Sequence, residues 1–265
     1  MKNVLLLVHD DEGQEARLQA ALDLTRMLNG HLTCIDVSVP QSVAGDFYSG
    51  ASDAILLEIE REREASNKAS LQARLGHEDV AWNWADTTST LADGVLQAAA
   101  LADIIVLNRQ LGPGHYAGMR GVASQVAVQS RKPILAVPEN LTRLELGRAL
   151  VAWDGQASSE AAIRACIPLL ALAEDVEIFM VRENGERTEP TEAAEYLSRH
   201  GIHAEVVIAQ SNNAGADGLI LEECALWNAD YVLMGAYGHG RLAETFGGVT
   251  KRMLANSKLP LIMTH

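Results

Sequence analysis

Short apolar runs alternate along this chain with longer stretches whose apolar residues recur at helical spacing. In the second half, β-rich runs lie at Ala149–Trp153, Val176–Val181, Glu205–Ile208, Tyr231–Met234 and Leu259–Met263. Helical stretches separate them, at Ser158–Ala173, Thr191–His200, Gly218–Trp227 and Val249–Ser257. Strands that alternate with helices of this length predict a parallel sheet covered on both faces.

The first half alternates in the same way but carries a longer insert at 41–75. The later part of this insert predicts a charged helix, and its "EIERERE" run is interpreted as a solvated face.

The two halves also resemble each other residue by residue. The stretch "ADIIVLNRQLGPGHYAGMRGVASQVAVQSRKPILAV" aligns without a gap with "ADYVLMGAYGHGRLAETFGGVTKRMLANSKLPLIMT", which places Gly121 over Gly248. The opening "KNVLLLVHDD" resembles "GRALVAWDG", with Asp10 over Asp154. Agreement over this length predicts a duplicated domain, at 1–140 and 147–265, joined by the polar "PENLTRLELG".

Composition and charge narrow the class of protein. The 265 residues are 48% hydrophobic, and 21 basic against 35 acidic residues give a net charge of −14. Such a surplus of acid disfavours nucleic acid and anionic membranes as partners, and it leaves any bound phosphate to be held by local donors. The three cysteines form no CxxC pair, and the sequence contains no apolar run of about 18 residues. The first apolar run is too short for a signal peptide. These observations predict a cytoplasmic protein.

Candidate chemistry lies where the strand order of such a sheet reverses. With five strands in the order 3-2-1-4-5, ligands bind beyond the carboxyl ends of the first and fourth strands. Asp154 ends the first strand of the second copy and Gly235 ends the fourth; Gly238 follows, and Gly248 precedes a helix with Thr250 in its first turn. Glycines let a ligand approach the backbone closely, and the start of a helix attracts anions such as phosphate. An aspartate accepts hydrogen bonds from an amine or a ribose hydroxyl. Together these features suit a nucleotide. The alternative is that the glycines only form a loop and Asp154 caps the next helix.

The two-copy plan and the Gly235-x-x-Gly238 loop resemble the universal stress protein family in its tandem form. The resemblance covers nearly the whole chain. It implies two flavodoxin-like domains of the adenine nucleotide α-hydrolase type, each a five-stranded parallel sheet. It also implies that the last strands, in "KPILAVPE" and "LPLIMTH", pair as an internal pseudo-dimer, and a further homodimer of such units stays open.

In that family an aspartate and a Gly-x2-Gly-x9-Gly-(Ser/Thr) loop bind ATP or a related adenine nucleotide. Nine residues separate Gly238 from Gly248, but Val249 occupies the Ser/Thr position. If "GGVT" instead matches the family's Gly-Ser-Val-Ser, the loop is one residue short and Thr250 is the later hydroxyl. His239 and Arg241 are candidate phosphate contacts, or they face solvent. The predicted nucleotide-binding residues are Asp154, Val181 (by its backbone), Gly235, Gly238, His239, Arg241, Gly247, Gly248, Val249 and Thr250.

The first copy departs from this pattern. Asn108 and Leu111 replace the first two glycines and Ala123 replaces Thr250, although Asp10 and Asp11 remain. This half is expected not to bind ATP in the family manner and to act as a scaffold or to hold another ligand.

The resemblance implies a stress-response protein whose second domain senses or stores ATP, ADP or AMP, with or without Mg²⁺. Two alternatives stay open, a protein-interaction module with an unknown protein partner and a slow metal-assisted ATPase. Neither a Ser/His/Asp order nor GxxxxGK[ST] is present, so no catalytic residue is assigned. His200 and His203 of "HGIH" are interpreted as surface histidines rather than metal ligands.

Overall fold

The computed structural model describes residues 1–39, 51–109, 121–182, 189–211, 214–236 and 248–265, and of these it describes 51–61 by their backbone alone.

Both halves contribute to one ten-stranded sheet, in the order β3-β2-β1-β4-β5-β10-β9-β6-β7-β8. Within each half neighbouring strands are parallel and follow 3-2-1-4-5, as predicted. The strands are β1 (Asn3–Val8), β2 (His31–Ser38), β3 (Ala81–Thr88), β4 (Ile104–Asn108), β5 (Ile134–Val137), β6 (Arg148–Trp153), β7 (Asp175–Arg182), β8 (Ala204–Gln210), β9 (Tyr231–Gly235) and β10 (Leu261–Thr264).

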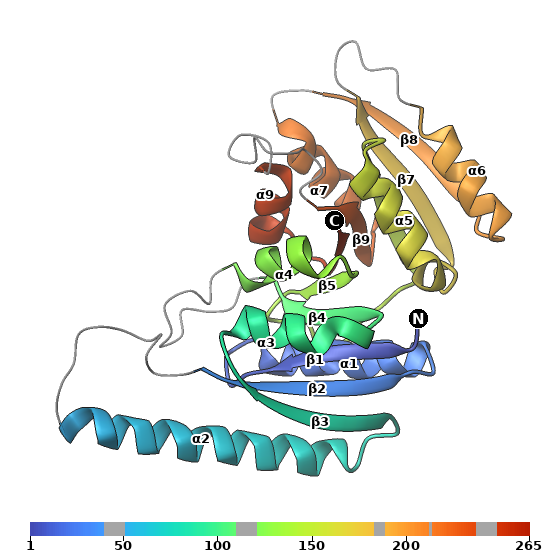
Figure 1. The fold of residues 1–265 in the computed structure, drawn as a ribbon. Helices are drawn as coiled ribbons and strands as arrows, with labels where there is room; N and C mark the ends of the chain where they lie inside the picture. Colours follow the sequence, from blue (N-terminus) through green and yellow to red (C-terminus); the bar gives the residue numbers. More distant parts are fainter. Residues whose placement is uncertain (40–50, 110–120, 183–188, 212–213, 237–247) are drawn as a thin grey trace.

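Helices cover both faces of the sheet (Figure 1). The first, second, fifth and sixth helices pack on one hydrophobic core, and the others pack on a second core across the sheet. This two-faced cover explains why the strands are apolar almost without interruption. The helices are α1 (Gln14–Met27), α2 (Ala51–Leu75), α3 (Leu91–Ala98), α4 (Val122–Ser130), α5 (Ala157–Leu170), α6 (Thr191–Arg199), α7 (Gly215–Trp227) and α9 (Gly248–Asn256).

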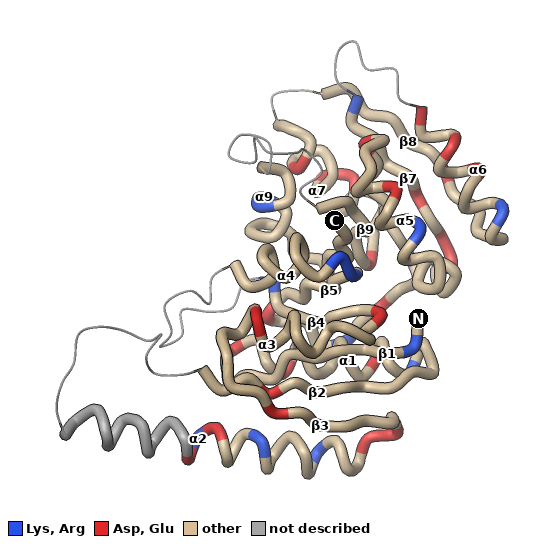
Figure 2. Tube along the Cα trace, viewed as in Figure 1, with Lys and Arg blue, Asp and Glu red and all other residues tan. Residues whose placement is uncertain are grey.

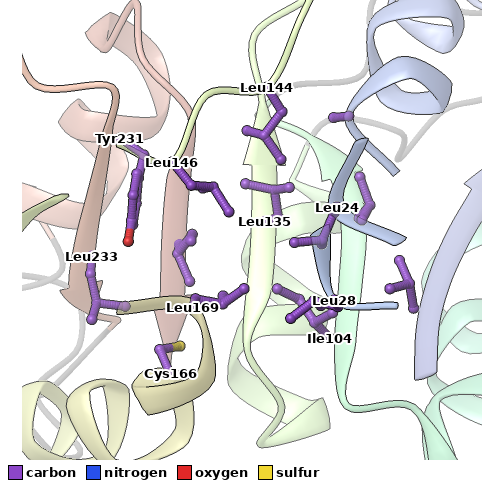
Figure 3. Packing of buried hydrophobic residues seen from close by; sticks show 14 of the residues in the cluster. Leu24, Leu28, Ile104, Leu135, Leu144, Leu146, Cys166, Leu169, Tyr231 and Leu233 are labelled. Atoms are coloured by element: carbon purple, nitrogen blue, oxygen red, sulfur yellow. The ribbon is translucent and has the colours of Figure 1, made fainter. Parts of the chain in front are cut away.

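The last strands of the two halves join the molecule in the middle. β10 pairs antiparallel with β5, in the register Leu261↔Ala136 to Met263↔Ile134. Figure 3 shows Leu135 of β5 and Leu146 of the segment between the halves packed near Leu169 of α5. The predicted internal pseudo-dimer is therefore confirmed.

A matching aspartate precedes the fourth strand of each half. Asp103 accepts hydrogen bonds from the backbone N–H of Lys2 at 2.6 Å and of Asn3 at 2.8 Å. Asp230 accepts one from the backbone N–H of Arg148 at 2.7 Å. Each bond fixes the entry of the first strand against the fourth, so the duplication extends to side-chain contacts.

The charged helix α2 forms where the sequence predicts it, but it is not only a solvated face. Arg63, within the "EIERERE" run, forms an ion pair with Asp10 at the end of β1. Further along α2, the Nη1 of Arg74 lies 2.5 Å from an Oε2 of Glu15 on α1. Figure 2 shows acidic and basic positions interspersed along this helix. Glu62 and Arg63 are exposed, so the described part of the run is solvated as predicted, and Arg63 additionally pairs with a neighbouring element.

The three cysteines are buried and free, and burial raises the pKa of each to about 12. They are packing residues that stay protonated at neutral pH. Among the helices described, none is long and apolar enough to cross a membrane.

Candidate functional site

The carboxyl ends of β6 and β9 form the edge at which the strand order of the second half reverses. These strands are parallel neighbours in the register Ala152↔Met234. Asp154 follows the end of β6, and Gly235 is the last residue of β9. The two predicted site residues therefore stand on adjacent strand ends, although they are far apart in sequence.

Asp154 is exposed, and one of its oxygens is fixed by the start of α5. Its Oδ1 accepts from the backbone N–H of Gln156 at 3.0 Å and from the Oγ of Ser159 at 2.7 Å. Ser159 is itself buried. Within the described residues Oδ2 has no hydrogen-bond donor, so one oxygen of this exposed carboxylate is left to accept from a ligand. The helix-capping alternative is not met, because Gln156 is the N-cap of α5 and no side chain caps the helix. Asp154 instead orders the turn that leads into α5, through the N–H two residues on.

The structure gives Gly235 a packing role. A Cβ placed on it would lie 2.6 Å from both the Oγ of Ser158 and the backbone N of Ser159. Real side chains do not approach backbone this closely, so only glycine lets the end of β9 lie against the start of α5. This contact supports the interpretation of Gly235 as a structural glycine, and it brings Asp154 and β9 close together.

Helix α9 begins at Gly248, one residue before the predicted start at Val249. A Cβ on Gly248 would lie 2.5 Å from the Nη1 of Arg252, so this guanidinium lies across the first residue of the helix. The Nη2 of Arg252 lies 2.7 Å from an Oδ1 of Asp217 on α7. Thr250 is buried and Val249 is half-buried against the second core. Arg252 and the adjacent Lys251 are both exposed cations in the first turns of this helix.

The other predicted site residues either lie in a strand or fall outside the described residues. Val181 is the penultimate residue of β7 and pairs with Ala209 of β8. Among the described residues no group of three or more His, Cys, Asp or Glu is placed to hold a metal ion. Four predicted residues lie outside the described residues: Gly238, His239, Arg241 and Gly247.

A buried arginine fills the corresponding edge of the first half. Arg17 of α1 is 0% exposed, and its Nη1 donates to both carboxylate oxygens of Asp11, at 2.9 and 3.0 Å. The same Nη1 donates to the Oδ1 of Asn108, which is the counterpart of Gly235. The Nδ2 of Asn108 donates to the carbonyl of Gly13 at 3.2 Å. Side chains thus occupy the space at which β4 meets α1.

Each half has one glycine where its fourth strand meets its first helix, but the glycine lies on the helix side in the first half and on the strand in the second. In the first half the strand carries Asn108 and the helix start carries Gly13, whose Cβ would collide with the Asn108 side chain. In the second half the strand carries Gly235 and the helix start carries Ser158. The loss of the glycine at Asn108 is therefore compensated inside the fold.

The strand register corrects one detail of the alignment. Val4 lies opposite Ile104 and Ala149 lies opposite Tyr231, so His9 rather than Asp10 takes the place of Asp154. The connection to the helix is longer in the first half, because α1 begins five residues after His9 and α5 begins three residues after Asp154. Gapless comparison of the first strands cannot reveal this difference in connection length.

Asp11 instead repeats the turn that Asp154 makes. Its Oδ1 accepts from the backbone N–H of Gly13 at 2.8 Å, two residues on. Because Asp11 is also the acceptor for Arg17, its carboxylate is engaged in the fold. Burial lowers the pKa of the neighbouring His9, against the attraction of the Asp11 carboxylate. The edge of the first half is closed by its own side chains.

Sequence reasoning missed Arg252, Asp217 and Arg17. Arg252 stands four residues after Gly248, a spacing that places both on one side of a helix. That signal was available once the start of α9 was known. Asp217 and Arg17 act through contacts with distant elements, which spacing along the chain does not disclose.

The similarity of this chain to known proteins lies in its structure. No family model and no curated protein matches the sequence. A solved universal stress protein from Archaeoglobus fulgidus DSM 4304 matches 99% of this chain over 97% of its own, with a TM-score of 0.76 at 16% identity. The chain has the tandem universal stress protein fold.

Other universal stress proteins match less closely. The structure of one from Pseudomonas aeruginosa UCBPP-PA14 covers 100% of this chain and 93% of its own, with a TM-score of 0.58 at 15% identity. One from Arabidopsis thaliana, which has AMP bound, covers 44% of this chain and 90% of its own, with a TM-score of 0.33 at 11% identity. At 16% and 15% identity, the two matches that span the whole chain show the fold alone.

Proposed function

We propose that this protein binds one adenine nucleotide per chain, at the carboxyl edge of β6 and β9 in its C-terminal half. The observation that carries the proposal is Asp154, an exposed carboxylate whose Oδ1 is held by two donors at the point where the strand order reverses. A fixed carboxylate oxygen at this edge is placed to accept from the exocyclic amine of adenine or from a ribose hydroxyl. Gly248 and the start of α9 would receive the phosphates.

The difference between the halves supports a stoichiometry of one. In the N-terminal half, Arg17 and Asn108 occupy the equivalent edge and their polar atoms are paired with one another. We assign that half, residues 1–140, a scaffold role and the half at 147–265 the binding role. ATP, ADP and AMP are all candidate ligands. Mg²⁺ would enter together with the phosphates, because most of the oxygen ligands of Mg²⁺ in such sites are water molecules and phosphate oxygens.

The cellular role that fits is a response to stress in which nucleotide occupancy of the C-terminal half is sensed by a protein partner. The short antiparallel junction of β5 and β10 would transmit a change from one half to the other, because it continues the sheet without a break.

Replacing Asp154 with alanine is expected to weaken nucleotide binding by about 10- to 100-fold, since a hydrogen bond to a charged acceptor contributes about 1.5–3 kcal/mol. Calorimetric titration of nucleotide-stripped protein with AMP and ATP measures this change. Asp175→Ala is the matched control, because it removes the same charge from the amino end of β7, at the opposite edge of the sheet. Equal affinity of the wild-type protein and Asp154→Ala would overturn the assignment, and unchanged melting temperatures would establish that both variants fold.

A further inference from the structure

A cavity of about 150 Å³ lies between α5 and α6 of the second half. Its apolar lining comes from Trp153 at the end of β6, Ile163 of α5, and Ala193 and Tyr196 of α6. The ring of Tyr196 packs against that of His200 one helical turn on, with the two ring centroids 4.9 Å apart. An apolar cavity of this size accepts one aromatic ring.

Trp153 brings an unpaired polar group to this lining. The residue is only 8% exposed, and its Nε1 is buried without a hydrogen-bond acceptor among the described residues. A buried donor without an acceptor destabilises a fold, so nearly all such groups in native proteins are paired. A molecule in the cavity that carries an acceptor would pair this N–H.

The fold itself does not require an indole at this position. In the register that places His9 over Asp154, Val8 is the counterpart of Trp153. Val8 is buried and has no polar side-chain atom. The duplicated strand therefore packs without an N–H at this place in the first half and has one in the second.

Charged side chains surround the apolar part of the cavity. Glu160 and Arg164 of α5 form an ion pair at 3.1 Å, and Glu192 of α6 is exposed. The charged lining residues thus carry one more negative charge than positive charges, in a chain whose net charge is −14. Anionic ligands are disfavoured there, whereas the carboxylate of Glu192 can accept a hydrogen bond from a neutral ligand.

The cavity lies on the other face of the sheet from part of the proposed nucleotide site. Trp153 and Ile163 belong to the first hydrophobic core. Val181 and Val249, two of the predicted nucleotide-binding residues, pack against the second core. A ligand in this cavity would therefore occupy a second site.

We propose that this cavity binds a small, neutral aromatic molecule that carries a carboxamide or a similar pair of acceptor and donor groups. Its ring lies among Ile163, Ala193 and Tyr196. Its carbonyl oxygen accepts from the Nε1 of Trp153, and its N–H donates to the carboxylate of Glu192. The inference goes beyond the proposed function and does not depend on it.

Benzamide and benzoate are the probes, because they differ in charge and hardly in shape. ¹H–¹⁵N NMR of the full chain records the indole N–H signals of the four tryptophans, and Trp153→Phe identifies the signal of Trp153. Benzamide is expected to shift this signal downfield and to bind with a Kd of about 1 mM or tighter, the range of a good single-ring ligand. Benzoate is expected to bind at least about tenfold more weakly because of its charge.

Two matched pairs of variants test the contacts. Trp153→Phe removes the N–H and keeps an aromatic wall, so it should weaken benzamide binding about 2- to 10-fold. Trp227→Phe is its control, because the ring of Trp227 lies against the guanidinium of Arg148 and outside the cavity. Glu192→Gln should narrow the difference between benzamide and benzoate, and Glu195→Gln, on the same helix but outside the cavity, should not.

Three results would overturn the inference. The first is a Trp153 signal that does not move in the wild-type protein at about tenfold the expected Kd of benzamide. The second is equal weakening by Trp153→Phe and Trp227→Phe, and the third is displacement of benzamide by AMP, which would show a single site. The expected pattern in a protein that does not bind AMP would support this inference and contradict only the proposed function.

Discussion

Replacing Arg17 with methionine is expected to lower the free energy of unfolding by about 3–5 kcal/mol, the cost of removing one partner from a buried ion pair. Arg17 is 0% exposed and donates through all of its guanidinium nitrogens. Its Nε donates to the carbonyl of Leu7 at 3.0 Å and its Nη2 to the carbonyl of His9 at 2.8 Å. The substitution would therefore leave two backbone carbonyls, the Asp11 carboxylate and the Asn108 amide short of donors.

Urea unfolding followed by far-ultraviolet circular dichroism measures this loss. Arg164→Met is the matched control: the Arg164 side chain is 54% exposed and pairs with Glu160 one helical turn away, so its loss should change stability by less than about 0.5 kcal/mol. A loss below about 1 kcal/mol for Arg17→Met would show that the edge of the first half is not held by this arginine. The scaffold role of that half would then lack its physical basis.

Replacing Glu177 with glutamine is expected to stabilise the protein by about 2–3 kcal/mol above pH 7 and to have little effect near pH 4. Glu177 of β7 is 2% exposed, and within the described residues its Oε1 has no hydrogen-bond partner. Burial raises its pKa to about 7, with Glu223 and Glu205 adding to the rise and Arg148 opposing it. A shift of one pKa unit corresponds to about 1.4 kcal/mol, and glutamine removes the ionisation with little change of shape.

The pH dependence of this stabilisation follows from the raised pKa of Glu177. An acid whose pKa is raised by folding contributes its full stability below the unfolded value of 4.5, and that contribution is lost as the pH rises through about 7. The advantage of Glu177→Gln should therefore grow between pH 5 and pH 8 in urea unfolding. Glu174→Gln, at an exposed position nearby, should show no such growth. An advantage that is equal at pH 5 and pH 8 would contradict the raised pKa.

Much of the fold follows from the sequence because the periodicity is strong and occurs twice. The predicted strand Tyr231–Met234 became β9, and the predicted helix Thr191–His200 became α6, each within one residue at either end. The pairing of β5 with β10 did not come from periodicity. It was implied by the resemblance to tandem universal stress proteins, because period-2 and period-3.6 patterns say nothing about which sheet edges meet.

The candidate site was less accessible to sequence reasoning, for identifiable reasons. Asp154 was found because it follows a central strand, and topology alone places such a residue at the edge. The sequence predicts ligand approach at Gly235, which stays a prediction, but it gives no sign of the packing contact with Ser158, which lies far away in the chain. Asp10 was aligned with Asp154 because an insertion between a strand and a helix leaves no mark on hydrophobic periodicity.

A crystal structure of the protein with AMP tests the central claim most directly. The account predicts one nucleotide per chain, with the base or ribose hydrogen-bonded to the carboxylate of Asp154 and the phosphate at Gly248 and the start of α9. No nucleotide should lie against Asn108 in the N-terminal half. A nucleotide bound at that end, or bound away from Asp154, would contradict the account.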